Sequence, residues 1–234
     1  MTEFAPVKEL IKDVPGWLSD EEGAALYDLA KECTGKGVIV EIGSWKGKST
    51  ICLGRGSRAG NGVRIFAVDP HADYRHGEFK ENVERAGIAD LVTPVKGLSQ
   101  DVVADFNEPI ELLFVDGSHE EEDVRSDFET WVPKVVEGGT VAFHDTTWHP
   151  GVRKVVAEKI FGSRRFRDVR FVVGSTTIAQ KVPRNTVYDR IHARRVQLMK
   201  AVFAALTSVV KKKRSWLPAP VERAGRRVFN LVGR

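Results

Sequence analysis

The stretch Val38-Ile39-Val40-Glu41-Ile42-Gly43-Ser44-Trp45-Lys46-Gly47-Lys48-Ser49 decides the fold. Its first five residues are apolar and β-branched except for Glu41, which predicts a short buried strand. Gly43 and Gly47 let the backbone turn tightly after that strand, and residues 48–58 then predict a helix. A strand, a glycine turn and a helix in this order are typical of the first unit of an α/β domain.

The same alternation continues along the chain. Further strands are predicted at 64–68, 91–95, 110–115 and 140–143, with helices between them near 77–87, 99–106 and 120–132. Apolar strands of this kind suit a parallel sheet that is buried on both faces, so we expect a doubly wound α/β domain. A helix over 15–32 precedes it, with Ser19 or Asp20 as the cap, and a helix near 151–161 follows. The last two strands, 167–173 and 176–181, are expected to pair as a hairpin.

Length and composition limit the classes of protein. The chain has 234 residues, of which 42% are hydrophobic and 29% charged, so it is expected to fold rather than remain disordered. It contains no run of 18 apolar residues and no apolar signal core at its start, which argues against a spanning helix or export. Two cysteines, Cys33 and Cys52, make neither a disulfide framework nor a zinc site. We therefore expect a cytoplasmic protein.

Charge divides the chain into two parts. Residues 1–183 carry a balance of −7, and residues 184–234 a balance of +11. We therefore predict a domain at 1–183 and a basic amphipathic helical tail at 184–234, whose apolar residues follow helical spacing over 187–210. The tail could pack on the domain, form a homodimer contact with a second subunit, or lie on the inner face of an anionic membrane. No nucleic acid is expected as a partner, because the acidic body would oppose phosphates.

The loop after the first strand points to a ligand other than a nucleotide triphosphate. Gly47-Lys48-Ser49 follows Gly43 by one residue too few for a phosphate-binding P-loop. Glu41 would repel a phosphate and suits a cation or a hydroxyl-rich group. An ordinary strand-to-helix turn is the alternative.

The ends of the next two strands are also polar. Asp69 is placed to accept both hydroxyls of a ribose, and the alternative is a helix cap. Ser99 and Gln100, after the third strand, could bind the edge of an adenine, although a capping role explains Ser99 equally well. The order of glycine turn, acid and polar turn favours a nucleoside-containing cofactor.

Acids also end the fourth and fifth predicted strands. Asp116 and Asp145 should face one cavity, because these strands are expected to be neighbours. Carboxylates suit Mg²⁺, which could bind two substrate oxygens and lower the pKa of a hydroxyl. His119 could take the proton of that hydroxyl and is preferred over His144. Trp148 and His149, in the loop after the fifth strand, are candidates for substrate contacts.

These motifs resemble those of class I S-adenosylmethionine-dependent methyltransferases, and most of all the metal-dependent O-methyltransferases. The pattern Glu-x-Gly-x-x-x-Gly-x-Ser of that group is present at residues 41–49, and the Gly-x-Ser-Gln-Asp pattern of its catechol enzymes at 97–101. Residues 114–119 (FVDGSH) and 142–146 (AFHDT) are similar to segments of bacterial sugar and macrolide-sugar O-methyltransferases. The resemblance extends over about residues 15–180 and leaves the tail outside.

The resemblance implies a seven-stranded, mostly parallel Rossmann-like sheet whose last strand is antiparallel. It also implies a site for S-adenosylmethionine formed by Glu41, Gly43, Ser44, Gly47, Ser49, Asp69, Ser99, Gln100 and Asp116. Glu41 would contact the ammonium group of the cofactor. Asp116 and Asp145 would hold Mg²⁺ or another divalent cation, with His144 as a third ligand or a second catalytic group, and His119 would be the base. Thr146 stands where the catechol enzymes carry an asparagine ligand, which leaves the third protein ligand open.

The sequence thus predicts a Mg²⁺-dependent O-methyltransferase that acts on a hydroxyl of a sugar, of a glycosylated metabolite or of a polysaccharide. A catechol or aryl O-methyltransferase is one alternative, disfavoured because His119 replaces the lysine base of those enzymes. A non-catalytic cofactor-binding scaffold, tethered by the basic tail, is another. An NAD-dependent oxidoreductase is disfavoured because the Gly-x-Gly-x-x-Gly pattern is missing.

Overall fold

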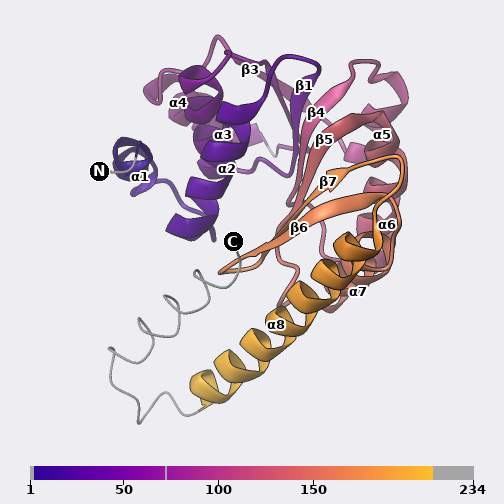
Figure 1. Cartoon of the computed structure of the whole chain (residues 1–234). Helices are drawn as coiled ribbons and strands as arrows, with labels where there is room; N and C mark the ends of the chain where they lie inside the picture. Colours follow the sequence, from indigo (N-terminus) through magenta and orange to yellow (C-terminus); the bar gives the residue numbers. More distant parts are fainter. Residues whose placement is uncertain (1–2, 72, 213–234) are drawn as a thin grey trace.

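The computed structural model describes residues 3–71 and 73–212, and its centre is a seven-stranded sheet (Figure 1). The strands run in the order β3-β2-β1-β4-β5-β7-β6. Their bounds are β1 Val38–Ile42, β2 Ile65–Asp69, β3 Val92–Lys96, β4 Ile110–Val115, β5 Val135–Phe143, β6 Phe166–Val172 and β7 Thr176–Lys181. The first five strands are parallel, and β7 is antiparallel to both of its neighbours. The predicted doubly wound sheet with an antiparallel last strand is confirmed.

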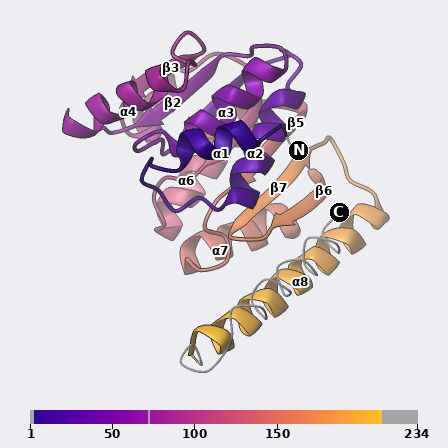
Figure 2. The same cartoon turned by 90° about the vertical axis from the view of Figure 1, so that its left-hand side faces the viewer.

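Helices cover both faces of the sheet and form three layers (Figures 1 and 2). One core cluster joins the sheet to the first four helices, and a second cluster joins it to the last four. The first set is α1 Ala5–Ile11, α2 Asp20–Glu32, α3 Lys48–Ala59 and α4 Asp73–Arg85, and the second is α5 Ser99–Asp105, α6 Glu121–Trp131, α7 Pro150–Val156 and α8 Val187–Lys212. A short 3₁₀ turn at Val132–Lys134 leads into β5, and a π-helical turn at Ala157–Phe161 extends α7.

Local chemistry explains where several elements begin. Of the two predicted caps, Ser19 is the one that caps α2, in a reciprocal capping box with Glu22. The acidic residues 121–123 lie in the first turn of α6, where the helix dipole favours negative charge. Helix α1 was not predicted, because its seven residues are too few to show a helical period. The helix packs on the domain through the buried side chains of Val7 and Ile11.

The tail begins as a helix that packs on the domain. Ala193 and Val196 of α8 lie in the same core cluster as residues of β4 and β5. Figure 1 shows that α8 then extends beyond the sheet. Among the described residues, every helix is either too short or too polar to cross a membrane. The part of the predicted basic tail beyond residue 212 lies outside the described residues.

Candidate active site

A cavity of about 1400 Å³ opens where the parallel strands end. It is larger than the 300–1000 Å³ of typical ligand pockets, so it has room for a cofactor and an acceptor together. Many of the residues predicted from the sequence line it, namely Gly43, Ser49, Asp69, Ser99, Gln100, Asp116, His119, His144, Asp145, Trp148 and His149. Glu41, Ser44 and Gly47 do not.

The glycine turn brings the ends of β1 and β4 close together. Gly43 has a φ of +86°, and a Cβ atom there would lie 2.1 Å from the carbonyl oxygen of Asp116. Only glycine fits this combination of left-handed backbone and close approach. Gly47 has a φ of +85° and precedes α3. Ser44 is buried, and its Oγ lies 3.4 Å from Nε2 of His71 rather than in the cavity.

Glu41 of β1 binds the start of α3. Its carboxyl oxygens accept hydrogen bonds from Ser49 Oγ, at 2.5 Å, and from Thr50 Oγ1. Glu41 is fully buried, and burial raises its pKa to about 8. A neutral carboxyl outside the cavity lining is poorly placed to meet an ammonium group, so the structure gives Glu41 a positioning role. The expected contact with the cofactor finds no support in this geometry.

Asp69 is held in place by two backbone amides. Its Oδ2 accepts from the Trp45 N–H at 2.9 Å, and its Oδ1 from the His71 N–H at 2.8 Å. Each carboxylate oxygen keeps a further lone pair for a ligand, which fits the predicted contact with ribose hydroxyls. Asp69 is the last residue of β2 and does not cap a helix.

The predicted adenine contacts are linked to an acid that the sequence did not indicate. Ser99 Oγ donates to Asp127 Oδ1 at 2.5 Å, and Ser99 does not cap α5, whose cap residue is Leu98. Asp127 is buried at the cavity wall, and burial raises its pKa to about 6. Because the Ser99 proton is committed to Asp127, the hydroxyl oxygen is the atom left to accept from an adenine amine. Gln100 lies beside it in the lining.

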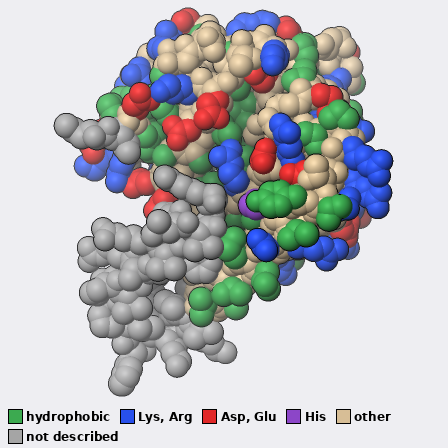
Figure 3. Space-filling model, in the orientation of Figure 1, with side chains coloured by type: hydrophobic (Ala, Val, Ile, Leu, Met, Phe, Trp, Pro, Cys, Tyr) green, Lys and Arg blue, Asp and Glu red, His purple; other side chains and the backbone are tan. Residues whose placement is uncertain are grey.

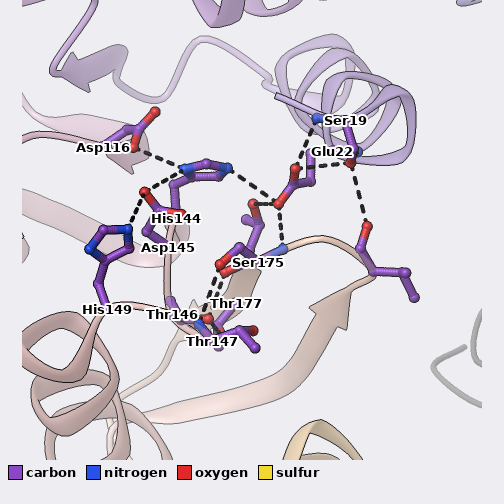
Figure 4. A network of polar contacts seen from close by, with 12 residues as sticks. Ser19, Glu22, Asp116, His144, Asp145, Thr146, Thr147, His149, Ser175 and Thr177 are labelled. Atoms are coloured by element: carbon purple, nitrogen blue, oxygen red, sulfur yellow. Dashed lines mark hydrogen bonds and ion pairs between the residues drawn. The ribbon is translucent and has the colours of Figure 1, made fainter. Parts of the chain in front are cut away.

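His144 lies between the two strand-end acids (Figure 4). Its Nδ1 is 3.0 Å from Asp116 Oδ1 and 3.6 Å from Asp145 Oδ2, and its Nε2 is 3.3 Å from Glu22 Oε1. Burial alone would lower the pKa of His144, but the three carboxylates outweigh burial and raise it to about 12. The three carboxylates therefore favour the protonated ring. The role of His144 as a second catalytic group stays a prediction.

His119 is the group best placed to accept a proton. Its Nε2 lies 2.9 Å from Asp145 Oδ2, and its side chain is 40% exposed in the cavity. The His149 ring lies against it, tilted by 35° with centroids 3.7 Å apart, and His149 Nε2 is 3.6 Å from the same Asp145 oxygen. Asp145 has a left-handed φ of +55°, a strained conformation that turns its carboxylate toward these rings. A carboxylate that orients an imidazole is the usual arrangement of a general base.

Glu22 is the second acid that sequence reasoning missed. It reaches the cavity from α2 and accepts from Ser175 N at 2.6 Å and from Thr176 Oγ1 at 2.9 Å. Burial disfavours its carboxylate, but His144 and Ser19 hold the pKa of Glu22 below its usual value. From the sequence, Glu22 was only one residue of the predicted helix at 15–32. Glu22 is far from the strand ends along the chain, so local sequence patterns do not place it in the site.

The acids and histidines fit a divalent cation. Two groups of three place their ligand atoms within 4.8 Å of one another, Asp116 with His144 and Asp145, and His119 with Asp145 and His149. Burial raises the pKa of Asp116, so a carboxylate there needs a nearby positive charge, which the His144 proton supplies in this structure. A bound cation would replace that proton. A mixed oxygen and nitrogen set suits Mn²⁺, Fe²⁺ or Zn²⁺ as well as Mg²⁺.

Comparison with known proteins identifies a related domain family and related folds. Residues 40–146 match the model of a methyltransferase domain family. The uncharacterized protein y4gI of Sinorhizobium fredii is 32% identical over 119 residues, which are 46% of this chain. The match spans only 13% of the length of that relative.

Two solved structures share the fold. The O-methyltransferase of Bacillus cereus, in complex with SAH, is 21% identical with a TM-score of 0.61, over 77% of this chain and 93% of that one. TomG of Streptomyces achromogenes, an O-methyltransferase in complex with SAM, is 20% identical with a TM-score of 0.60, over 77% and 91%. The family match over residues 40–146, the strand order and the glycine turn agree, and this chain has the fold of the S-adenosylmethionine-dependent O-methyltransferases.

Proposed function

We propose that this chain transfers the methyl group of S-adenosylmethionine to a hydroxyl of a sugar or of a glycosylated molecule. The observation that carries the proposal is the pair formed by His119 Nε2 and Asp145 Oδ2, 2.9 Å apart in the cavity wall. Transfer of a methyl group from a sulfonium to an oxygen needs a base for the hydroxyl proton and an in-line approach of that oxygen. His119 supplies the base, and Asp145 orients it.

The cavity divides into a cofactor half and an acceptor half. Gly43, Asp69, Ser99 and Gln100 line the first half and suit the methionine, ribose and adenine parts of the cofactor. His119, Trp148 and His149 line the second half. An aromatic face beside groups that bind hydroxyls suits a sugar, and His119 stands where the catechol enzymes use a lysine base.

A divalent cation completes the proposed site. Asp116, Asp145 and His144 would hold it, and Mg²⁺ is the cation that the sequence resemblance implies. When bound, it would polarise the acceptor hydroxyl and lower its pKa. The chain's own residues orient the acceptor and accept its proton at His119 Nδ1, the ring nitrogen that does not face Asp145.

The test is methyl transfer from radiolabelled S-adenosylmethionine to a panel of free sugars, glycosides, glycolipids and catechols, with and without a chelator. We expect transfer to a sugar hydroxyl that the chelator suppresses. His119→Ala should lower kcat by about 10²–10⁴-fold and leave S-adenosylhomocysteine binding unchanged. The matched control is His192→Ala, since His192 lies on α8 and contacts the Val169 carbonyl outside the cavity.

Three results would count against the proposal. Transfer to catechols alone would support an aryl O-methyltransferase. Activity that the chelator does not affect would remove the cation from the mechanism. Cofactor binding without transfer to any acceptor of the panel would support a non-catalytic scaffold.

A further inference from the structure

The outer face of α8 is apolar although it lies in solvent. Val187, Ile191, Leu198, Val202 and Leu206 recur at spacings of four and seven residues, and each is between 44% and 66% exposed. This spacing places them along one stripe of the helix. We call these five residues the outer stripe of α8.

The opposite face of α8 is already used. Ala193, Val196, Lys200 and Phe203 are buried against the domain, and Phe203 contacts Phe171 of β6 at a ring distance of 5.6 Å. A helix that only covered the sheet would need apolar residues on this inner face alone. The outer stripe therefore needs a second explanation.

Positive charge accompanies the outer stripe. Arg194 and Arg195 are exposed within it, and α8 contains one acid, Asp189, which binds the backbone and side chain of Thr186 at the start of the helix. In Figure 3, hydrophobic and basic side chains lie next to one another over the lower part of the molecule, where Figure 1 places α8. The chain continues with Lys211-Lys212-Lys213-Arg214. The outer face thus combines apolar surface with unbalanced positive charge.

We propose that the outer stripe of α8 docks on an anionic membrane surface. A helix lying in the plane of the interface buries an apolar stripe at the level of the headgroups and places its basic side chains on lipid phosphates. Both needs are met here, because the five apolar side chains share one stripe and the arginines flank it. Contacts between the inner face of α8 and the domain hold the helix axis parallel to that surface.

Charge favours a membrane over a second copy of the chain. If two outer stripes paired, Arg194 and Arg195 of both copies would come together, with no carboxylate on either stripe to neutralise them. Like charges placed together oppose association. A surface of phosphates neutralises the two guanidinium groups of a single copy.

The test measures co-sedimentation of the full chain with vesicles of phosphatidylcholine alone and of phosphatidylcholine with about one third phosphatidylglycerol. We expect binding to the second kind only, and weaker binding at higher salt. Arg194→Gln with Arg195→Gln should lower the partition coefficient about 25-fold, since each charge near the surface contributes about fivefold. Leu198→Gln with Val202→Gln should lower it at least tenfold without a change in charge.

The matched control is Gln197→Ala with Ser208→Ala, at two exposed positions of α8 outside the outer stripe. It should bind vesicles as the original chain does. Thermal unfolding and S-adenosylhomocysteine binding of every variant show whether the fold is intact. The proposal is overturned if the Leu198 and Val202 variant binds vesicles normally, or if neutral vesicles bind equally well. A dimer in light scattering that this variant dissociates would identify a second copy as the occupant and would also overturn it.

Discussion

Lys200 is a buried amine that contacts no carboxylate within residues 3–71 and 73–212, and replacing it by methionine should stabilise the protein. It is 6% exposed, and its Nζ donates to Thr177 Oγ1 at 3.2 Å. The rings of Phe161 and Phe171 lie 5.8 and 5.7 Å from the charge. Burial, together with the positive charge of Arg153, lowers the pKa of Lys200 to about 7. Methionine has a similar length and needs no charge in this place.

The size of the effect follows from the pKa. In the unfolded chain Lys200 keeps a pKa near 10.5, so the unfolded state binds more protons between pH 7 and 10.5 and stability rises with pH over that window. The full cost of the buried charge, about 5 kcal/mol, is present below pH 7 and disappears near pH 10.5. Loss of the hydrogen bond to Thr177 offsets about 1 kcal/mol. We expect Lys200→Met to gain about 2–4 kcal/mol at pH 6.5.

Urea unfolding, followed by tryptophan fluorescence at pH 6.5 and pH 9.5, measures this. The gain in the free energy of unfolding should shrink by about 3 kcal/mol between the two pH values. Lys12→Met is the control, because the Lys12 side chain is 69% exposed and its removal should change stability by less than about 0.5 kcal/mol at either pH. The reasoning is refuted if Lys200→Met destabilises the protein equally at both pH values.

Three further predictions follow from the cavity. Gly43→Ala should lower the free energy of unfolding by about 3 kcal/mol or more and weaken S-adenosylhomocysteine binding, because the new Cβ would lie 2.1 Å from the Asp116 oxygen. Gly35 has a similar φ of +88° and nothing within 4 Å, so the control Gly35→Ala should lower it by only about 1 kcal/mol. Equal losses in the two variants would contradict this. Glu41→Gln should flatten the decrease in stability between pH 5 and 8, because the folded state binds a proton at Glu41 up to a pKa of about 8; parallel profiles in urea unfolding would count against it. Trp17 lines the cavity with an 84% exposed ring stacked on Trp45, whose amide binds Asp69 of the cofactor half. Trp17→Ala should raise the KM for S-adenosylmethionine with little change in thermal stability, and an unchanged KM would exclude Trp17 from the cofactor site.

The acids at the strand ends could be predicted because their position follows from local order alone. Asp69, Asp116 and Asp145 each follow an apolar strand, and the carboxyl ends of parallel strands meet at one edge of a sheet. The glycine turn was recognisable for the same reason. No long-range information was needed to place these residues in one cavity.

Residues that reach the cavity from helices could not be predicted in this way. Glu22 and Asp127 enter it from α2 and α6, and their depth depends on how those helices pack on the sheet. Glu41 was predicted from its motif to contact the cofactor. In the structure it is buried, and its carboxyl group accepts hydrogen bonds from Ser49 and Thr50 instead. Alternation along a strand indicates burial but not which neighbour satisfies a buried acid.

The contact between α2 and the turn before β7 has a consequence for how the protein matures. Glu22 binds Ser175 N and Thr176 Oγ1, which follow it in the chain by 153 and 154 positions. During synthesis from the N-terminus, Glu22 leaves the ribosome long before these partners exist, and its carboxylate stays hydrated until they arrive. This wall of the cavity therefore closes only after the hairpin of β6 and β7 has been made. A nascent chain acquires its complete pocket late, when most of the sheet is already in place.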